Sequence, residues 1–241
     1  MEITRNIAYT AHDNSHPRHL LDIYLPKDVA GFPVLMFVSG GGWSSGSKDW
    51  VANLGPAFAA QGIAVVTVDH RLLPDVTYDQ QVEDLARAFV WLKQNIATYG
   101  GDPDQIIVGG HSAGGHLIGL LAMDERYLDA TGYKADSISG VLLVSAALDV
   151  GDRFGRADIE AASPLNHVRA GLPPFLLLSA ESDLPGLSKQ AETMTAALQA
   201  VDVSVETRVV ANRDHFNIVH HLGSSGDAAT QIIGDWLARS R

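Results

Sequence analysis

Short apolar runs rich in β-branched residues recur along the 241-residue chain and alternate with longer amphipathic segments. Runs of this length, bounded by turn-forming residues, are typical of strands. We expect strands at Leu20–Leu25, Pro33–Ser39, Ile63–Asp69, Gln105–Gly110, Ile138–Ala146, Pro174–Ala180 and Val203–Val210. Because the runs are apolar throughout, they indicate a sheet that is covered on both faces.

The amphipathic segments have the spacing of helices that cover a sheet. One of them has apolar residues every three or four positions, at Val82, Leu85, Phe89, Leu92 and Ile96. Further helices are expected from Leu187 to Ala200 and from Asp227 to Ala238. Strands that alternate with helices favour a mostly parallel sheet with right-handed crossovers. The pattern therefore predicts a single α/β domain over residues 1–241, with ligands at the carboxyl edge of its sheet.

A serine follows one of the expected strands. Ser112 is the central residue of Gly110–Gly114, which reads Gly-His-Ser-Ala-Gly, and a helical pattern begins directly after it. A strand, a sharp turn and a helix in this order project the serine hydroxyl to a place where a substrate carbonyl can reach it. The motif predicts a nucleophile. The motif is short enough to occur by chance in a glycine-rich chain, so the assignment of Ser112 as a nucleophile depends on finding its catalytic partners.

A neutral serine needs a general base, and the base needs a group that orients it. Asp183 follows the expected strand Pro174–Ala180, and His215 follows the strand that ends near Val210. Both residues lie beyond strand ends, at the edge where Ser112 emerges, and they follow the chain order Ser, Asp, His of this architecture. We predict that these three residues are catalytic.

Other residues stay open for the roles of acid and base. Glu181 lies close to the favoured acid, and Asp149 follows the preceding strand, a position where some serine hydrolases carry the acid. His220 and His221 lie close to the favoured base. The spacing favours Asp183 over these carboxylates without excluding them.

The oxyanion of the reaction needs backbone N–H donors. Residues 39–43 read Ser-Gly-Gly-Gly-Trp and close the expected strand Pro33–Ser39, so their amides can approach a ligand closely. We expect the oxyanion hole to consist of Gly41, Gly42 and Ala113. Two aromatic residues next to these motifs, Trp43 and Phe216, are candidate substrate-binding walls of the pocket.

Composition narrows the classes of partner. The formal net charge of -11 and the absence of lysine or arginine runs disfavour nucleic acid and anionic membranes. The chain has no cysteine, and its N-terminal histidines lie in a polar stretch that is more typical of solvated surface than of a metal site: His12, His16 and His19. We expect no metal and no cofactor. The N-terminal residues 1–6 lack the apolar core of a secretory signal, which favours the cytoplasm.

Several motifs together resemble a known family. The Gly-Gly-Gly-Trp loop, Val68–Pro74, Gly101–Pro103, the Gly-His-Ser-Ala-Gly-Gly-His-Leu segment and Asp214–Phe216 are similar to those of α/β-hydrolase carboxylesterases of the hormone-sensitive-lipase and feruloyl-esterase-like kind. The resemblance runs from about Leu20 to the C-terminus. It implies an α/β-hydrolase fold and a serine hydrolase that acts on small carboxylic esters. Only about twenty residues precede the first clear strand, so we expect a minimal cap or none, unlike larger relatives in the lipase-like group.

A narrower likeness gives an alternative substrate. Gly46–Asp49, Leu143–Ser145 and the Asp-His-Phe segment resemble kynurenine formamidases, which implies hydrolysis of an aryl formamide. One position departs from the family, because Ser39 stands where the loop normally begins with histidine. This departure motivates a third hypothesis, a non-catalytic binding protein that keeps the hydrolase fold.

Overall fold

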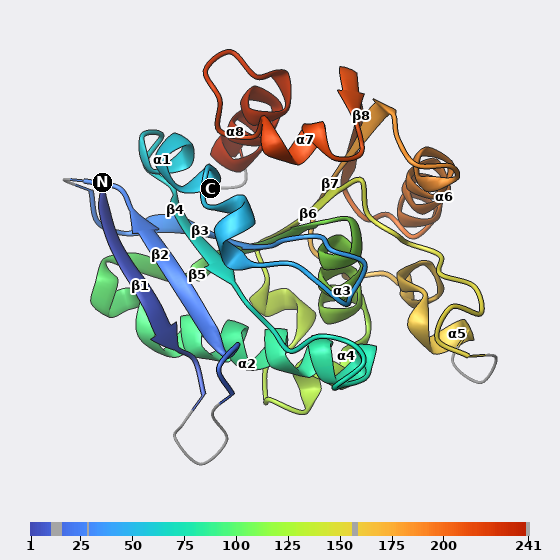
Figure 1. Cartoon of the computed structure of the whole chain (residues 1–241), viewed down its shortest axis with the longest axis horizontal. Coiled ribbons are helices and arrows are strands. Elements are labelled where there is room, and N and C mark those ends of the chain that lie inside the picture. Colours follow the sequence, from blue (N-terminus) through green and yellow to red (C-terminus); the bar gives the residue numbers. More distant parts are fainter. Residues whose placement is uncertain (11–15, 28, 156–158, 240–241) are drawn as a thin grey trace.

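The computed structural model describes residues 1–10, 16–27, 29–155 and 159–239 (Figure 1). Within these residues eight strands form one sheet in the order β1-β2-β4-β3-β5-β6-β7-β8. The strands are β1 (Glu2–Ala8), β2 (Leu20–Leu25), β3 (Phe32–Val38), β4 (Ala64–Val68), β5 (Gly101–His111), β6 (Gly140–Val144), β7 (Phe175–Ser182) and β8 (Val205–Asp214). Strand β2 pairs antiparallel with β1 and β4, and the remaining neighbours are parallel.

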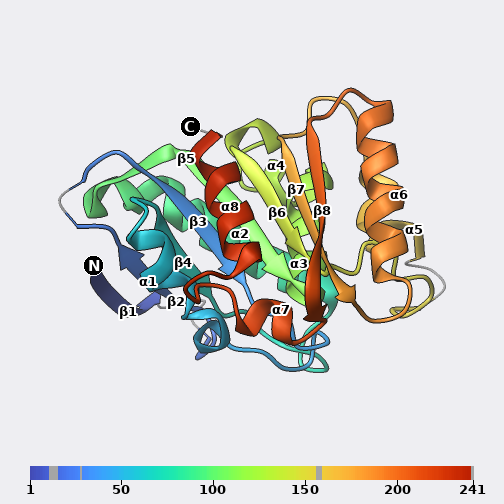
Figure 2. The same ribbon diagram turned by 90° about the horizontal axis from the view of Figure 1, so that it is seen from above.

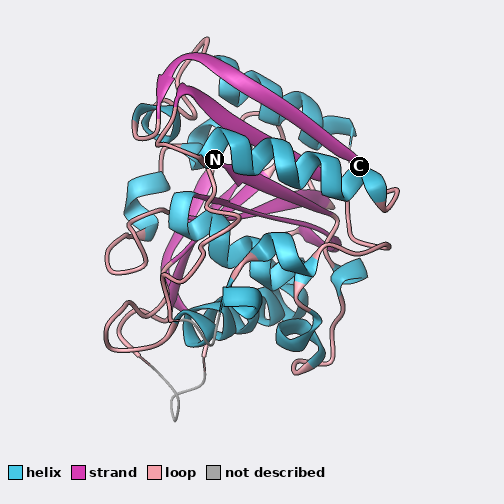
Figure 3. Ribbon diagram, turned by 90° about the vertical axis from the view of Figure 1, so that its right-hand side faces the viewer, coloured by secondary structure: helices cyan, strands magenta, loops and turns pink. Residues whose placement is uncertain are grey.

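Helices cover both faces of the sheet, which lies between them in Figure 3. One face packs against α2 (Tyr78–Asn95), α3 (Ser112–Met123) and α6 (Leu187–Ala200). The other face packs against α1 (Leu54–Ala59) and α8 (Ala228–Arg239), which lie in front of the sheet in Figure 2. Three short helices complete the described set: α4 (Glu125–Asp129), α5 (Ile159–Ala162) and α7 (Asn217–His220). The predicted class, a mostly parallel α/β sheet with helices on both faces, is confirmed.

The parallel part of the sheet matches the expected strands closely, and two differences have physical causes. Strand β1 was not predicted, because most of its residues are exposed and its sequence carries no core pattern. Strand β5 begins at Gly101 instead of Gln105, because Gly100 turns the chain in a left-handed conformation and Gly101 already pairs with Phe32. In the described part of the long segment between β6 and β7 the chain forms α5 and a 3-10 turn at Pro164–His167.

Candidate active site

The turn between β5 and α3 holds Ser112 in a conformation that serine rarely adopts. Its φ angle is 53°, in the left-handed region, so the side chain leaves the sheet edge at a sharp bend. A Cβ atom on Gly110 would lie 2.6 Å from the carbonyl oxygen of Gly114, and one on Gly114 would lie 2.4 Å from the carbonyl oxygen of Ser39. Both glycines are therefore required by backbone contacts around the serine.

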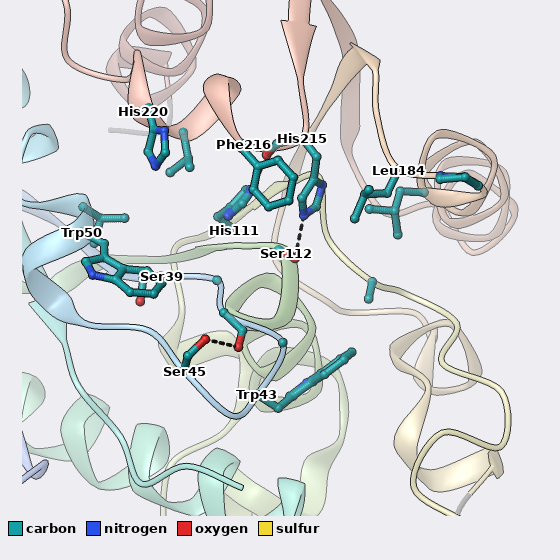
Figure 4. A pocket seen from close by; sticks show the side chains of 18 of the residues that line it. Ser39, Trp43, Ser45, Trp50, His111, Ser112, Leu184, His215, Phe216 and His220 are labelled. Atoms are coloured by element: carbon teal, nitrogen blue, oxygen red, sulfur yellow. Dashed lines mark hydrogen bonds between the residues drawn. The ribbon is translucent and has the colours of Figure 1, made fainter.

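Three predicted residues from separate strand ends form one hydrogen-bonded chain, and Figure 4 shows its link between His215 and Ser112. Nδ1 of His215 lies 2.7 Å from Oδ1 of Asp183, and Nε2 of His215 lies 2.9 Å from Oγ of Ser112. A carboxylate only accepts hydrogen bonds, so Nδ1 carries the proton and Nε2 accepts from the Ser112 hydroxyl. His215 is 4% exposed, so most water is excluded from this chain.

Four donors surround the carboxylate of Asp183. Oδ1 also accepts from the backbone N–H of Leu184 at 2.9 Å, while Oδ2 accepts from the hydroxyl of Ser145 at 2.6 Å and from the N–H of Ala180 at 3.1 Å. Burial tends to raise the pKa of Asp183, but the hydrogen bonds from His215, Ser145 and the backbone outweigh it and lower that pKa. The carboxylate stays ionised beside the histidine.

Ser145 was missed as a site residue by the sequence reasoning. It directly follows β6, and its φ angle of 46° places it in the left-handed region. The available signal was its position at a carboxyl strand end, next to the strand that carries Asp183. Nothing in the local sequence shows that its hydroxyl turns toward the carboxylate.

The alternative acids and bases lie elsewhere in the structure. Glu181 accepts the backbone N–H of Asn212 at 2.8 Å, and Asp149 accepts that of Gly151 at 3.2 Å. Within the described residues neither carboxylate is hydrogen-bonded to His215, and neither His220 nor His221 is hydrogen-bonded to Ser112. Geometry therefore favours Asp183 and His215.

His111 supports the backbone of His215. Its Nε2 lies 2.8 Å from the His215 carbonyl oxygen, and the two rings pack with their centroids 4.8 Å apart. Burial lowers the pKa of His111 to about 4, so the ring is neutral near pH 7. A Cβ atom on Gly40 would lie 2.7 Å from Nδ1 of His111, so only glycine fits against this ring. The histidine before the serine thus contributes to the packing of the turn.

The expected oxyanion loop runs from Ser39 to Trp43 beside Ser112. Gly41, Gly42 and Trp43 have φ angles of 141°, 59° and 64°, which explains the run of glycines. Within the described residues no carbonyl accepts the N–H of Gly41 or Gly42. The N–H of Ala113 lies in the first turn of α3, where helical N–H groups have no acceptor within the helix. All three predicted amides therefore retain donor capacity next to the serine.

Other contacts hold this loop where the family histidine is replaced by Ser39. The hydroxyl of Ser45 donates to the Gly41 carbonyl at 2.7 Å, and Arg18 donates to the Gly46 carbonyl at 2.8 Å. Asp69 accepts the backbone N–H of Lys48 at 2.7 Å. The loop therefore stays ordered through contacts at and beyond its C-terminal end, although Ser39 replaces the family histidine at its start.

The Gly-Ser-Lys-Asp segment anchors this loop to the core. Nζ of Lys48 lies 2.8 Å from Oδ1 of the fully buried Asp22 on β2. Lys48 therefore points into the core and does not line the pocket that contains Ser112. Asp69 also bonds Arg18 at 3.2 Å, whereas Arg71 pairs with Asp84 at 2.7 Å. Asp69 and Arg71 therefore brace two different elements and do not pair with each other.

A pocket of about 610 Å³ opens above Ser112. The glycine loop, Trp43 and Trp50 form one wall, while Leu184 and Phe216 lie on the opposite side (Figure 4). Both predicted substrate-binding residues line this space, but they differ in exposure: Phe216 is 63% exposed, whereas Trp43 is 8% exposed. Phe216 is therefore available at the mouth, and Trp43 presents only part of its ring.

Trp43 is fixed from behind by a buried histidine. Its Nε1 donates to Nδ1 of His116 at 3.0 Å, and Nε2 of His116 donates to the Ala162 carbonyl at 2.7 Å. Burial lowers the pKa of His116 to about 4, which keeps Nδ1 free to accept. The pocket wall is thereby continuous with the core.

The two N-terminal histidines that the structure describes differ in exposure, although their rings lie 5.5 Å apart. His16 is exposed, but His19 is 4% exposed, with Nε2 3.1 Å from Oδ1 of Asp84, so the expectation was wrong for His19. The position of β2 in the interior of the sheet explains this burial. His12 lies outside the described residues. In the described ranges no group of three or more histidine, cysteine or carboxylate residues could hold a metal ion.

The family model BD-FAE matches residues 21–159, more than half of the sequence, including the glycine loop and the Ser112 turn. The chain belongs to the BD-FAE family. Esterase LipC of Mycobacterium tuberculosis is 31% identical to this BD-FAE chain over 78% of it and 54% of the relative. A probable isoprenylcysteine alpha-carbonyl methylesterase of Arabidopsis thaliana is 26% identical over 97% of this chain and 56% of the relative. The chain thus spans about half the length of these curated relatives.

Solved structures give the same fold. The esterase Est2 of Thermogutta terrifontis is 25% identical to this BD-FAE chain, with a TM-score of 0.78 over 99% of this chain and 90% of the other. A truncated carbohydrate esterase from gut microbiota has a TM-score of 0.84 at 19% identity, over 100% and 96% of the two chains. The fold is that of carboxylesterase-type α/β-hydrolases. No helix in the described ranges is long and apolar enough to cross a bilayer.

Proposed function

We propose that this BD-FAE protein is a single-domain carboxylesterase that works through an acyl-enzyme on Ser112. The observation that carries the proposal is the hydrogen-bonded chain from Asp183 through His215 to Ser112, at distances of 2.7 and 2.9 Å. The esterase names of its relatives support ester hydrolysis as the reaction. Small carboxylic esters suit a pocket of about 610 Å³.

The three side chains divide the proton transfers between them. As Oγ of Ser112 attacks the ester carbonyl, Nε2 of His215 takes its proton, and ionised Asp183 stabilises the resulting imidazolium. The alcohol then leaves with the proton from His215. Water, activated by the same nitrogen, hydrolyses the acyl-enzyme and restores the serine.

The backbone amides of Gly41, Gly42 and Ala113 are the proposed oxyanion hole. Gly41 and Gly42 have N–H groups without a carbonyl acceptor in the described part of the chain, and Ala113 directly follows the nucleophile. Fixed amides of this kind stabilise the tetrahedral intermediate without reorganising during the reaction. Because these donors are backbone N–H groups, the loop can stabilise the oxyanion without the histidine side chain that Ser39 replaces.

Aryl formamide hydrolysis remains the second candidate. Its support is the exposed ring of Phe216 at the pocket mouth, against which an aromatic leaving group could stack. The Gly-Ser-Lys-Asp likeness does not add to it, because Lys48 is buried against Asp22 away from the pocket.

One panel tests these functions together. Esters from acetyl to decanoyl, feruloyl esters and N-formyl-kynurenine are compared with wild-type protein and with Ser112→Ala. We expect hydrolysis of short esters, and a loss of more than about a thousandfold in kcat for the variant with an unchanged unfolding temperature. An esterase rate that survives in Ser112→Ala would overturn the proposal.

A covalent probe separates the enzyme from a non-catalytic binding protein. One related structure shows the Thermogutta terrifontis esterase phosphorylated by paraoxon, at 25% identity. We expect paraoxon or a fluorophosphonate to label this chain stoichiometrically at Ser112, read by mass spectrometry. Absence of labelling, with a folded protein, would support the binding-protein hypothesis.

A further inference from the structure

One arginine in the wall of the pocket has no acidic partner in the part of the chain that the structure describes. Arg153 follows β6 and lines the same pocket as Ser112. Every other arginine that the structure describes has a carboxylate oxygen within 3.3 Å. The side chain of Arg153 has neither an ion pair nor a hydrogen bond within the described residues, and only its backbone N–H is bonded, to the Val150 carbonyl. An exposed guanidinium at a pocket wall is thus left available to a ligand.

Aromatic packing fixes the position of this arginine. Its guanidinium carbon lies 4.5 Å from the ring centroid of Trp43. The next residue, Phe154, packs edge-on against Trp43 with centroids 5.2 Å apart and lies 4.7 Å from the ring of Tyr78. Because Trp43 is itself held by His116, the segment that carries Arg153 is attached to the wall of the pocket.

The contact with Trp43 leaves the hydrogen-bonding edge of the guanidinium free. The indole of Trp43 carries an N–H donor and no oxygen or nitrogen acceptor, so this contact satisfies none of the five N–H donors of the guanidinium by an ordinary hydrogen bond. Two parallel N–H groups match the two oxygens of a carboxylate, which makes arginine the preferred residue for that group. Trp43 therefore orients Arg153 without satisfying its donors.

The charges around the pocket favour the binding of an anion beside Arg153. Aspartate and glutamate are absent from the described residues that line the pocket. The neighbouring Asp149 is engaged by the N–H of Gly151 and the hydroxyl of Ser163. The whole chain carries a formal net charge of -11, which repels anions in general. The guanidinium of Arg153 is a local exception to this negative field.

We propose that Arg153 forms a carboxylate-binding subsite, so that the preferred substrates are small esters that carry a carboxylate on their acyl or alcohol part. This inference rests on the proposed esterase function and names its substrate class. If Arg153 served only to pack on Trp43, the charge of the substrate would not affect its contribution. The two roles therefore predict different effects of substrate charge on kcat/KM.

Two pairs of esters test the subsite. Monomethyl glutarate is compared with methyl pentanoate for a carboxylate on the acyl side, and 4-acetoxybenzoate with 4-acetoxybenzamide for the alcohol side. The readout is the ratio of kcat/KM for the anionic and the neutral ester of each pair. We expect Arg153→Gln to lower this ratio about tenfold in at least one pair. The affected pair identifies the side that bears the carboxylate.

Two further variants serve as controls. Arg208→Gln removes the same charge from exposed β8 outside the pocket, so it reports the general field of the protein and should leave the ratio unchanged. Arg153→Lys keeps the charge but loses the paired donors, so it should restore the ratio only in part. A ratio unaffected by Arg153→Gln in both pairs would overturn the subsite, even if Ser112-dependent hydrolysis of neutral esters upheld the esterase. Loss of all hydrolysis in wild type would instead count against the proposed function.

Discussion

At the residue scale, the contacts of Asp183 show how the proposed acid is held. Each carboxylate oxygen accepts two hydrogen bonds, and Ser145 supplies the shortest of the four at 2.6 Å. An ionised acid that is fixed in this way can keep the imidazole of His215 in one orientation. Ser145 is 2% exposed, so water cannot readily replace its hydroxyl.

We predict that Ser145→Ala lowers kcat about tenfold, because a hydrogen bond to a charged group is lost and Asp183 gains freedom to turn. KM should change little, since the hydroxyl does not line the pocket. Steady-state kinetics measure this split. Ser139→Ala is the matched control, because its hydroxyl bonds the Asp104 carbonyl in a separate part of the chain. Equal kcat in both variants would contradict a positioning role for Ser145.

At the element scale, the turn between β5 and α3 is packed directly on the end of β3. Gly114 is the point of closest approach, because a Cβ atom there would meet the carbonyl oxygens of Ser39 at 2.4 Å and Val38 at 2.6 Å. These are backbone atoms of a paired strand and its loop, so they cannot move without separating the two proposed sources of oxyanion donors. The glycine therefore sets the distance between Ala113 and the glycine loop.

We predict that Gly114→Ala destabilises the fold by about 1–3 kcal/mol and lowers kcat more than it changes KM. Thermal unfolding and ester kinetics give the two values. Gly234→Ala in α8 is the control, because the added methyl group meets only the flexible side chain of Gln61 and alanine favours a helix. Wild-type kinetics and stability in Gly114→Ala would show that the turn tolerates a wider spacing.

At the scale of the whole molecule, three neutral histidines are buried in the fold. Burial lowers the pKa of His70, His111 and His116 to about 4, from an ordinary value near 6.5. Above pH 6.5 each is neutral in both the folded and the unfolded chain. Between about pH 6.5 and 4 the unfolded chain binds protons that the folded chain does not, so acid favours unfolding.

We predict that the unfolding temperature falls steadily between pH 6.5 and 4, with a contribution on the order of 3 kcal/mol per histidine at the lower limit. Asp183, whose pKa is lowered, adds a loss only as the pH falls below about 4. Calorimetry across this range measures the slope. His116→Gln can keep both hydrogen bonds and should reduce the slope. The same slope in wild type and variant would show that His116 takes up its proton in the folded state.

Local sequence patterns predicted most of the sheet and the proposed catalytic residues. Strands β2 to β7 are mostly buried and contain apolar runs, whereas β8 is largely exposed and was recognised by its β-branched residues. Ser112, Asp183 and His215 each follow such a strand, and parallel strands bring their carboxyl ends to one edge. Their approach to within hydrogen-bond distance also depends on the strand order β5-β6-β7-β8, which the local patterns did not predict.

The sequence by itself determined the class of fold, the turn at Ser112 and the order of the acid and the base, because each depends on residues adjacent along the chain. The tertiary structure alone decided that Ser145 bonds Asp183, that His19 is buried, and that Arg153 lines the pocket with no carboxylate partner among the residues described. These features depend on contacts between segments that are distant in sequence. Short-range periodicity carries no information about the direction of one polar side chain relative to another.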